Sequence, residues 1–171
     1  MEFTTLTPQE YEAFQNQHPY RDFMNSRKAM KLKEIQNWEV EYVGVKEQDT
    51  ILCATPLTSI PVMKVYRFFY AQRGFLIDYH NEELLQYFTK ELTAYLKRKK
   101  GLYMVVDPNV LYKERDMNGE LVEQGFDNSY VIDHMIKAGY EHQGFTKDFQ
   151  VISEIRWMFS LYLDGKDEAT L

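Results

Sequence analysis

The chain has 171 residues, of which 44% are hydrophobic and 27% charged, a composition typical of one compact globular domain. Its 20 basic and 26 acidic side chains leave a net charge of −6, which disfavours a domain that binds nucleic acid by itself, because polyanions require a basic surface. The longest uncharged apolar runs are shorter than the ~20 residues that cross a bilayer, and residues 1–7 lack the layout of a signal peptide. We therefore expect a protein of the cytoplasm.

The first part of the sequence predicts a strand followed by two helices. Residues 2–7 are typical of a short strand. Residues 7–10, Thr-Pro-Gln-Glu, supply an N-cap, a proline at the first helical position and an acid in the first turn, so we expect a helix that runs to about residue 17. A second helix should run from residue 25 or 26 to about residue 36. Its apolar positions are Ala29, Met30 and Ile35.

Three stretches rich in β-branched and aromatic residues follow, at residues 38–46, 50–62 and 65–71. They predict consecutive antiparallel strands. Residues 46–49 form a polar hairpin turn, and Pro61 should bend or end the second strand.

The second half predicts a long helix, a strand and further elements after a loop. Apolar residues recur at helical spacing over residues 81–100, and Gly101 should serve as the C-cap. The apolar run at residues 102–106 is typical of a strand covered on both faces. After it we expect a long loop at 109–127, a helix from 127 or 128 to 138, and strands at 140–145 and 155–163.

This order of elements predicts an α+β layered domain with a mixed, mainly antiparallel sheet flanked by helices. It resembles the GCN5-related acyltransferases. Those enzymes hold acetyl-CoA pyrophosphate on a Gly-rich turn, and no such turn stands at residues 78–82 or 106–127, so we expect no acetyl-CoA and no other cofactor. We expect residues 1–163 to form a single domain and residues 164–171, which have the pattern of a new helix start, to begin the next segment of a longer protein.

Two runs of basic residues interrupt the acidic average. Residues 97–100 end the long helix, where cations complement the helix dipole. The other run lies near the start of the second helix, where the dipole does not favour positive charge, and so makes a candidate anion site; it comprises Arg27, Lys28, Lys31 and Lys33.

Several short strings together resemble the Fem family of peptidoglycan-branching aminoacyltransferases, close to its FemA-like members. The strings are His18-Pro19-Tyr20, residues 59–65, Phe69-Tyr70-Ala71-Gln72-Arg73-Gly74, Ile77-Asp78-Tyr79, Leu102-Tyr103 and Val106-Asp107-Pro108. The resemblance implies an enzyme of two GCN5-like domains that moves an amino acid from aminoacyl-tRNA to the stem-peptide lysine, or to the interpeptide bridge, of a peptidoglycan precursor. That precursor is lipid II or its UDP-linked form.

The same resemblance implies what this chain contributes. It corresponds to the N-terminal, precursor-binding part, which we expect to be inactive when isolated, and the basic surface for tRNA should lie largely in a missing C-terminal part. Peripheral association with the inner membrane face and association between Fem proteins are further expectations. The alternative is a non-catalytic module that binds a cell-wall precursor or a partner Fem protein.

Five candidate site residues follow from the resemblance. Lys33 matches the family lysine that contacts the phosphate-bearing end of the precursor, with Lys31 or Arg27 as alternatives. Asp107 matches the family aspartate considered as a general base; otherwise it caps the following turn. We expect Lys33 and Asp107 on opposite sides of one groove.

The other three candidates are Arg73, Tyr20 and Tyr103. Arg73 could bind a precursor anion or pair with an acid on the surface, and it precedes Gly74, which can supply a positive φ. Tyr20 and Tyr103 line a peptide groove or pack in the core. The four histidines and Cys53 show no metal-ligand spacing, so we expect no metal site.

Overall fold

The chain folds into a five-stranded sheet with helices on both faces. The computed structural model describes residues 1–145, so the predicted strand at 155–163 and the expected boundary near residue 163 lie outside the described residues. In chain order the elements are β1 (Glu2–Thr5), α1 (Pro8–Gln17), the 3₁₀ helix η1 (Phe23–Asn25), α2 (Arg27–Ile35), β2 (Glu39–Glu47), β3 (Thr50–Val62), β4 (Tyr66–Ala71), α3 (Glu82–Arg98), β5 (Gly101–Val106) and α4 (Tyr130–Lys137).

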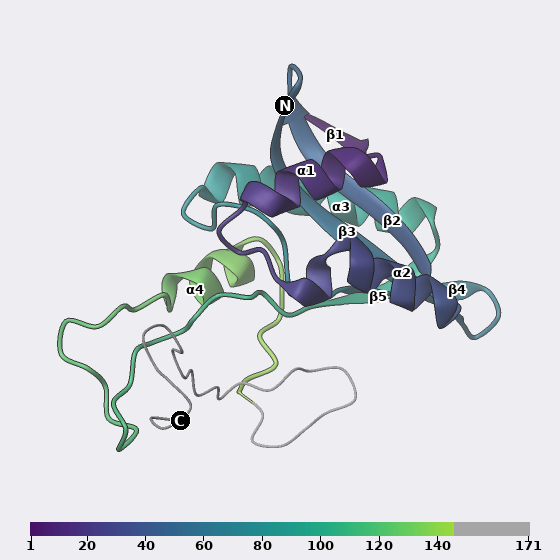
Figure 1. Ribbon diagram of the computed structural model, residues 1–171. Helices are drawn as coiled ribbons and strands as arrows, with labels where there is room; N and C mark the ends of the chain where they lie inside the picture. Colours follow the sequence, from purple (N-terminus) through teal and green to yellow (C-terminus); the bar gives the residue numbers. More distant parts are fainter. Residues whose placement is uncertain (146–171) are drawn as a thin grey trace, which may run out of the picture.

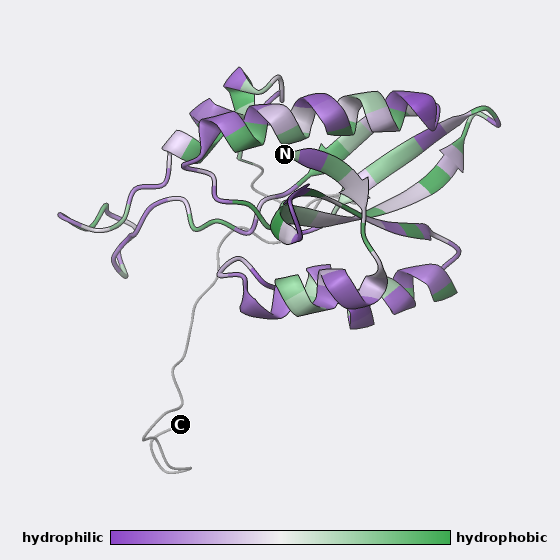
Figure 2. Cartoon of the chain, turned by 90° about the horizontal axis from the view of Figure 1, so that it is seen from above, coloured by the Kyte–Doolittle hydropathy of each residue, from purple (hydrophilic) through white to green (hydrophobic). Residues whose placement is uncertain are grey.

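The sheet order is β1-β2-β3-β4-β5, and every neighbouring pair is antiparallel except β4 and β5. The parallel pair arises because α3 carries the chain back along the sheet before β5 begins. Helices α1 and α2 cover one face and α3 covers the other (Figures 1 and 2). This arrangement confirms the predicted α+β class with a mixed, mainly antiparallel sheet.

Two apolar clusters divide the core between the faces. The larger cluster lies between α3, α4 and the sheet and includes Leu85 and Phe88, both fully buried. The smaller cluster lies under α1 and α2 and includes Tyr11 and Met30. Successive side chains of β4 point to opposite faces of the sheet. Phe69 belongs to the larger cluster, which we call the α3 cluster, so Phe68 and Tyr70 point toward the face covered by α1 and α2.

The start of α1 agrees with the predicted capping motif. The Thr7 side chain accepts a hydrogen bond from the Glu10 backbone N–H, and the Glu10 carboxylate accepts one from the Thr7 backbone N–H. Lys46 donates a hydrogen bond to the same carboxylate and, with these Thr7 contacts, lowers the pKa of Glu10 to about 2. The capping box therefore also ties α1 to β2.

The structure corrects the predicted end of α3. Lys100, with φ 60°, takes the left-handed position after the helix, whereas Gly101 already belongs to β5. Glycine is still favoured there because a Cβ at position 101 would lie in a tight contact, 3.0 Å from the carbonyl oxygen of Leu96. Close packing of the strand against the helix end, not a turn, explains this glycine.

Three further predictions are wrong in detail. β5 is the edge strand of the described sheet, so Leu102 and Tyr103 are about half exposed and the strand is not covered on both faces. Ile35 is exposed although it fits the helical apolar pattern. Residues 140–145 form no strand. Pro61 keeps its place in the ladder opposite Arg67, and β3 ends one residue later at Val62; whether Pro61 bends the strand stays a prediction.

We predict that truncating a side chain of the α3 cluster destabilises the chain far more than the same truncation at the sheet edge. Leu85→Ala should cost about 2–5 kcal/mol through lost burial and an unfilled cavity. Leu102→Ala, which removes the same atoms from a side chain that is 50% exposed, should cost less than about 1 kcal/mol. Urea unfolding monitored by circular dichroism measures both, and equal losses would contradict the assigned packing.

Candidate functional site

The carboxyl ends of β4 and β5 meet because the two strands are parallel, with Ala71 paired to Val106. Asp107 follows β5 directly. Its Oδ1 accepts a 2.7 Å hydrogen bond from the Arg73 backbone N–H, and its Oδ2 accepts a 3.0 Å hydrogen bond from the Tyr70 hydroxyl. We call this arrangement of Asp107, Tyr70 and Arg73 the strand-end clamp.

The turn after β4 is shaped by two consecutive residues in the left-handed region, Arg73 with φ 57° and Gly74 with φ 76°. A Cβ on Gly74 would lie 2.5 Å from the Cα of Pro108, so the Asp107-Pro108 step packs directly on the glycine. The predicted positive φ at Gly74 is confirmed. The turn is thus closed by backbone contact, and the next residue, Phe75, is buried in the core.

Asn25 holds the same turn from the other side, and sequence reasoning missed it. This side chain is fully buried; its Nδ2 donates to the carbonyl oxygens of Arg73 and Tyr20, both at 3.4 Å. Its Oδ1 accepts from the Asp22 backbone N–H at 3.0 Å. The sequence signal was the pair Asp22 and Asn25, which stand three residues apart as N-cap and N3 of a short helix.

A second group of candidates lies where α2 ends. The Lys33 ammonium stands 5.3 Å from the centroid of the Trp38 ring, within the range of a cation–π contact. Trp38 meets Phe68 edge-on at 6.1 Å, and Phe68 contacts Tyr103 at 4.8 Å between ring centroids. Lys33, Trp38, Phe68 and Tyr103 therefore form a continuous row, which we call the lysine–aromatic row.

The lysine–aromatic row and the strand-end clamp occupy one face of the sheet. Phe68 and Tyr70 are two residues apart on β4 and point to the same side. In the β4–β5 register Phe68 pairs with Tyr103. Four residues of strand separate Tyr103 from Asp107, or ~13 Å. The structure thus brings Lys33 and Asp107 to the same face; the groove between them stays a prediction.

Tyr20 lies beside the clamp as a half-buried aromatic and does not join the lysine–aromatic row. Its ring is 5.7 Å from that of Tyr79 and 5.6 Å from that of His18. Tyr79 is fully buried, and burial raises its pKa well above the usual value, so this hydroxyl stays protonated. Burial also lowers the pKa of His18. Tyr20 therefore contacts two aromatic side chains, Tyr79 and His18, whose pKa shifts both favour the uncharged form.

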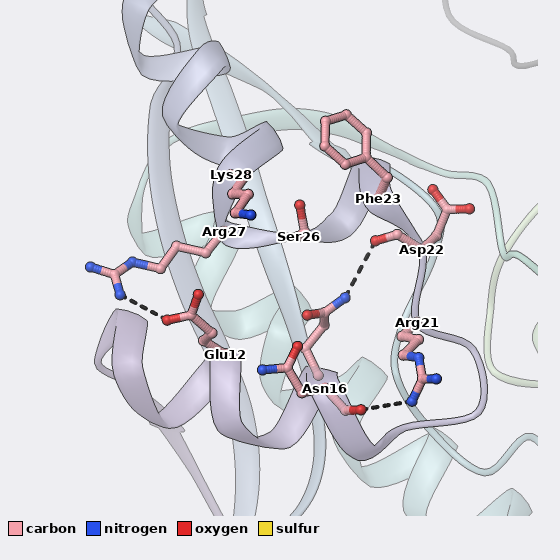
Figure 3. Close-up of a pocket in the computed structure, with 9 residues that line it drawn as sticks. Glu12, Asn16, Arg21, Asp22, Phe23, Ser26, Arg27 and Lys28 are labelled. Carbon is pink, nitrogen blue, oxygen red and sulfur yellow. Dashed lines mark hydrogen bonds and ion pairs between the residues drawn. The ribbon is translucent and has the colours of Figure 1, made fainter.

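A cavity of about 380 Å³ opens between α1, η1 and the start of α2 (Figure 3). Across it Arg27 forms a 2.8 Å ion pair with Glu12, and Arg21 donates to the Asn16 carbonyl oxygen at 2.7 Å. Because the charge of Arg27 is already paired, Lys33 is the stronger of these two candidates for binding an external anion.

Within residues 1–145, no group of three or more His, Cys, Asp or Glu side chains could hold a metal ion. In the same part of the chain, no helix combines the length and apolarity of a membrane span. Cys53 is buried in the core, and burial raises its pKa to about 12, so its thiol does not act as a nucleophile near neutral pH.

Comparison with known proteins places these features in context. The FemAB family profile matches residues 6–171. Aminoacyltransferase FemA of Staphylococcus aureus, in strains bovine RF122 / ET3-1 and MW2, is 37% identical over 169 residues, or 98% of this chain and 40% of the relative. The chain therefore spans about two fifths of the length of the curated relatives it matches.

A solved structure supports the fold. The crystal structure of FemX superposes with a TM-score of 0.71 at 24% identity, covering 88% of this chain and 35% of that chain. The likeness confirms the layered architecture predicted from the sequence. It carries no information about which residues react.

We predict that Gly74→Ala destabilises the chain more than Gly119→Ala. Both glycines have a positive φ, at 76° and 83°, so backbone strain should destabilise both variants by about 1 kcal/mol. At position 74 the new Cβ would also lie 2.5 Å from the Cα of Pro108, whereas at position 119 no atom lies within 4 Å of it. Urea unfolding of both variants measures the difference, and equal losses would rule out the packed turn.

Proposed function

The chain belongs to the FemAB family, and we propose that its protein transfers an amino acid from aminoacyl-tRNA to a peptidoglycan precursor, lipid II or its UDP-linked form. The acceptor is the stem-peptide lysine or the end of the interpeptide bridge. This chain supplies the N-terminal, precursor-binding part. The support comes from its likeness to staphylococcal aminoacyltransferase FemA and from the common sheet face that carries Lys33 and Asp107.

The observation that carries the proposal is the lysine–aromatic row. A diphosphate needs a cation held at a rigid rim, and Lys33 is fixed near the Trp38 ring at the end of α2. Tyr103, half exposed at the sheet edge, offers an aromatic surface at the other end of the row. The precursor would then extend along β4 and β5 toward Asp107, about 13 Å from Tyr103.

The transfer itself needs little covalent chemistry from the protein. The acceptor amine attacks the ester carbonyl of the aminoacyl-tRNA, an amide bond forms, and the ester C–O bond breaks. The amine gives up a proton and the released ribose oxygen takes one, so the step balances without another reactant. The protein contributes chiefly by holding the amine and the ester together.

Asp107 is the candidate proton acceptor, and the strand-end clamp fixes its orientation. Both carboxylate oxygens already accept a hydrogen bond, from Arg73 and from Tyr70. A carboxylate oxygen can accept more than one hydrogen bond. The clamp therefore suits either a general base or a group that orients the amine, and the two roles respond differently to substitution.

We predict that Lys33→Met weakens binding of UDP-linked muramyl-pentapeptide by about tenfold or more, because a charge-assisted contact to phosphate is lost. Lys64→Met removes the same charge from the exposed turn between β3 and β4, outside the lysine–aromatic row, and should leave binding unchanged. Isothermal titration of the full-length protein measures both.

Lys31→Met tests the alternative within the same helix. A loss of affinity at Lys31 and none at Lys33 would transfer the assignment to Lys31. Precursor binding with no transfer from alanyl-, seryl- or glycyl-tRNA would instead favour a non-catalytic module.

We predict that Asp107→Asn lowers kcat of the full-length protein by about 10²-fold or more if the carboxylate accepts the amine proton. Tyr70→Phe is the matched variant, since it removes one hydrogen bond of the strand-end clamp and leaves the carboxylate. It should retain most of kcat. Equal losses in the two variants, measured with saturating substrates, would assign Asp107 a positioning role.

A further inference from the structure

A groove between α3 and α4 lies outside the site described above. Its volume is about 510 Å³. Three of its eight lining residues are lysines and none is acidic; the lining comprises Gln86, Thr89, Lys90, Thr93, Ala94, Lys97, Lys137 and Ala138. The lining is therefore locally basic, although the chain as a whole has a net charge of −6.

The lysines of α3 are spaced along one stripe of the helix. Lys90 and Lys97 are seven residues apart, which is about two turns or ~10.5 Å. Thr93 lies between them with an exposed side chain. The groove therefore offers two ammonium groups and a hydroxyl in line, followed by the basic run at the end of α3.

One of the three groove lysines, Lys137, already has an acidic partner. Glu82, at the start of α3, contacts Lys137 at 3.3 Å and His134 at 3.1 Å. Lys137 is thus partly neutralised. Lys90 and Lys97 form no ion pair with any residue in the described part of the chain, so their charge is available to an external anion.

We infer that this groove binds the sugar–phosphate backbone of RNA, and in particular that of the aminoacyl-tRNA, an inference that rests on the proposed function. Lysines in line with a hydroxyl donor match successive phosphates of an extended polyanion. A membrane surface fits less well, because helices that lie in a bilayer interface present large apolar side chains beside their lysines. Here the apolar lining consists of Ala94 and Ala138 alone.

The position of the groove defines what it contributes. It lies on the α3 side of the sheet, whereas Lys33 and its aromatic row lie on the side of α1 and α2. Contacts made there do not reach the reacting ester. They add affinity and orientation for the tRNA, and they place part of the RNA surface within this chain.

The test is the steady-state kinetics of the full-length protein with Lys90→Ala and Lys97→Ala combined. The KM for aminoacyl-tRNA should rise about tenfold, and the slope of log KM against log salt should fall by about 2, one for each lost phosphate contact. The KM for precursor and the kcat at saturation should stay unchanged. Lys64→Glu, which lowers the net charge by the same two units at an exposed turn, is the control.

The outcomes separate the two proposals. Wild-type protein that transfers no amino acid from any aminoacyl-tRNA would overturn the proposed function. Active wild type with an unchanged tRNA KM in the double variant would overturn the RNA groove alone. An equal rise in the KM for aminoacyl-tRNA in the Lys64→Glu control would show that net charge alone causes the effect, and it would also overturn the RNA groove. Loss of sedimentation with phosphatidylglycerol vesicles, at an unchanged tRNA KM, would assign the groove to a membrane instead.

Discussion

The contact of Asp107-Pro108 with the turn at Arg73-Gly74 is the constraint on which the candidate site depends. Parallel strands lack a hairpin to fix their ends, so β4 and β5 need another connection where both leave the sheet. The hydrogen bond from the Arg73 N–H to the Asp107 carboxylate supplies it. The close approach of Pro108 to Gly74 locks the same step sterically. Asp107 is therefore a structural group first, and any chemical role uses an orientation that the fold already imposes.

The buried Asn25 connects the turn at Arg73-Gly74 to the helices that cover this face of the sheet. It joins the Arg73 carbonyl to the segment between α1 and α2, and the Tyr11 hydroxyl of α1 donates to its backbone oxygen at 2.7 Å. The start of α2 is thus positioned relative to the end of β4 by hydrogen bonds as well as by apolar packing. Because Lys33 lies on α2, its place on the sheet face depends on a residue that contacts no proposed substrate.

The sequence predicted most elements because their signals are local. The capping residues before α1 and the apolar spacing of α3 gave boundaries within a residue or two of those observed. The errors occur where tertiary position decides. The pattern of β5 does not show that it is an edge strand, and Gly101 resembles a C-cap although close packing against the helix end favours glycine there. The candidate residues came from family resemblance, whereas Asn25 and Tyr70 were missed because their partners are distant in sequence.

The distribution of charge gives the two faces of the sheet different properties. On the α1 and α2 face, Arg27 and Lys46 are paired with Glu12 and Glu10, whereas Lys33 lies beside an aromatic ring. On the α3 face, the lysines of the groove act as a series of point charges. A single cation beside aromatic rings selects a compact ligand with a defined phosphate position, whereas a line of cations binds a long polyanion with little specificity. The two proposed anion sites are therefore compatible with an acidic domain, because the local separation of charge, and not the net charge, determines what each face attracts.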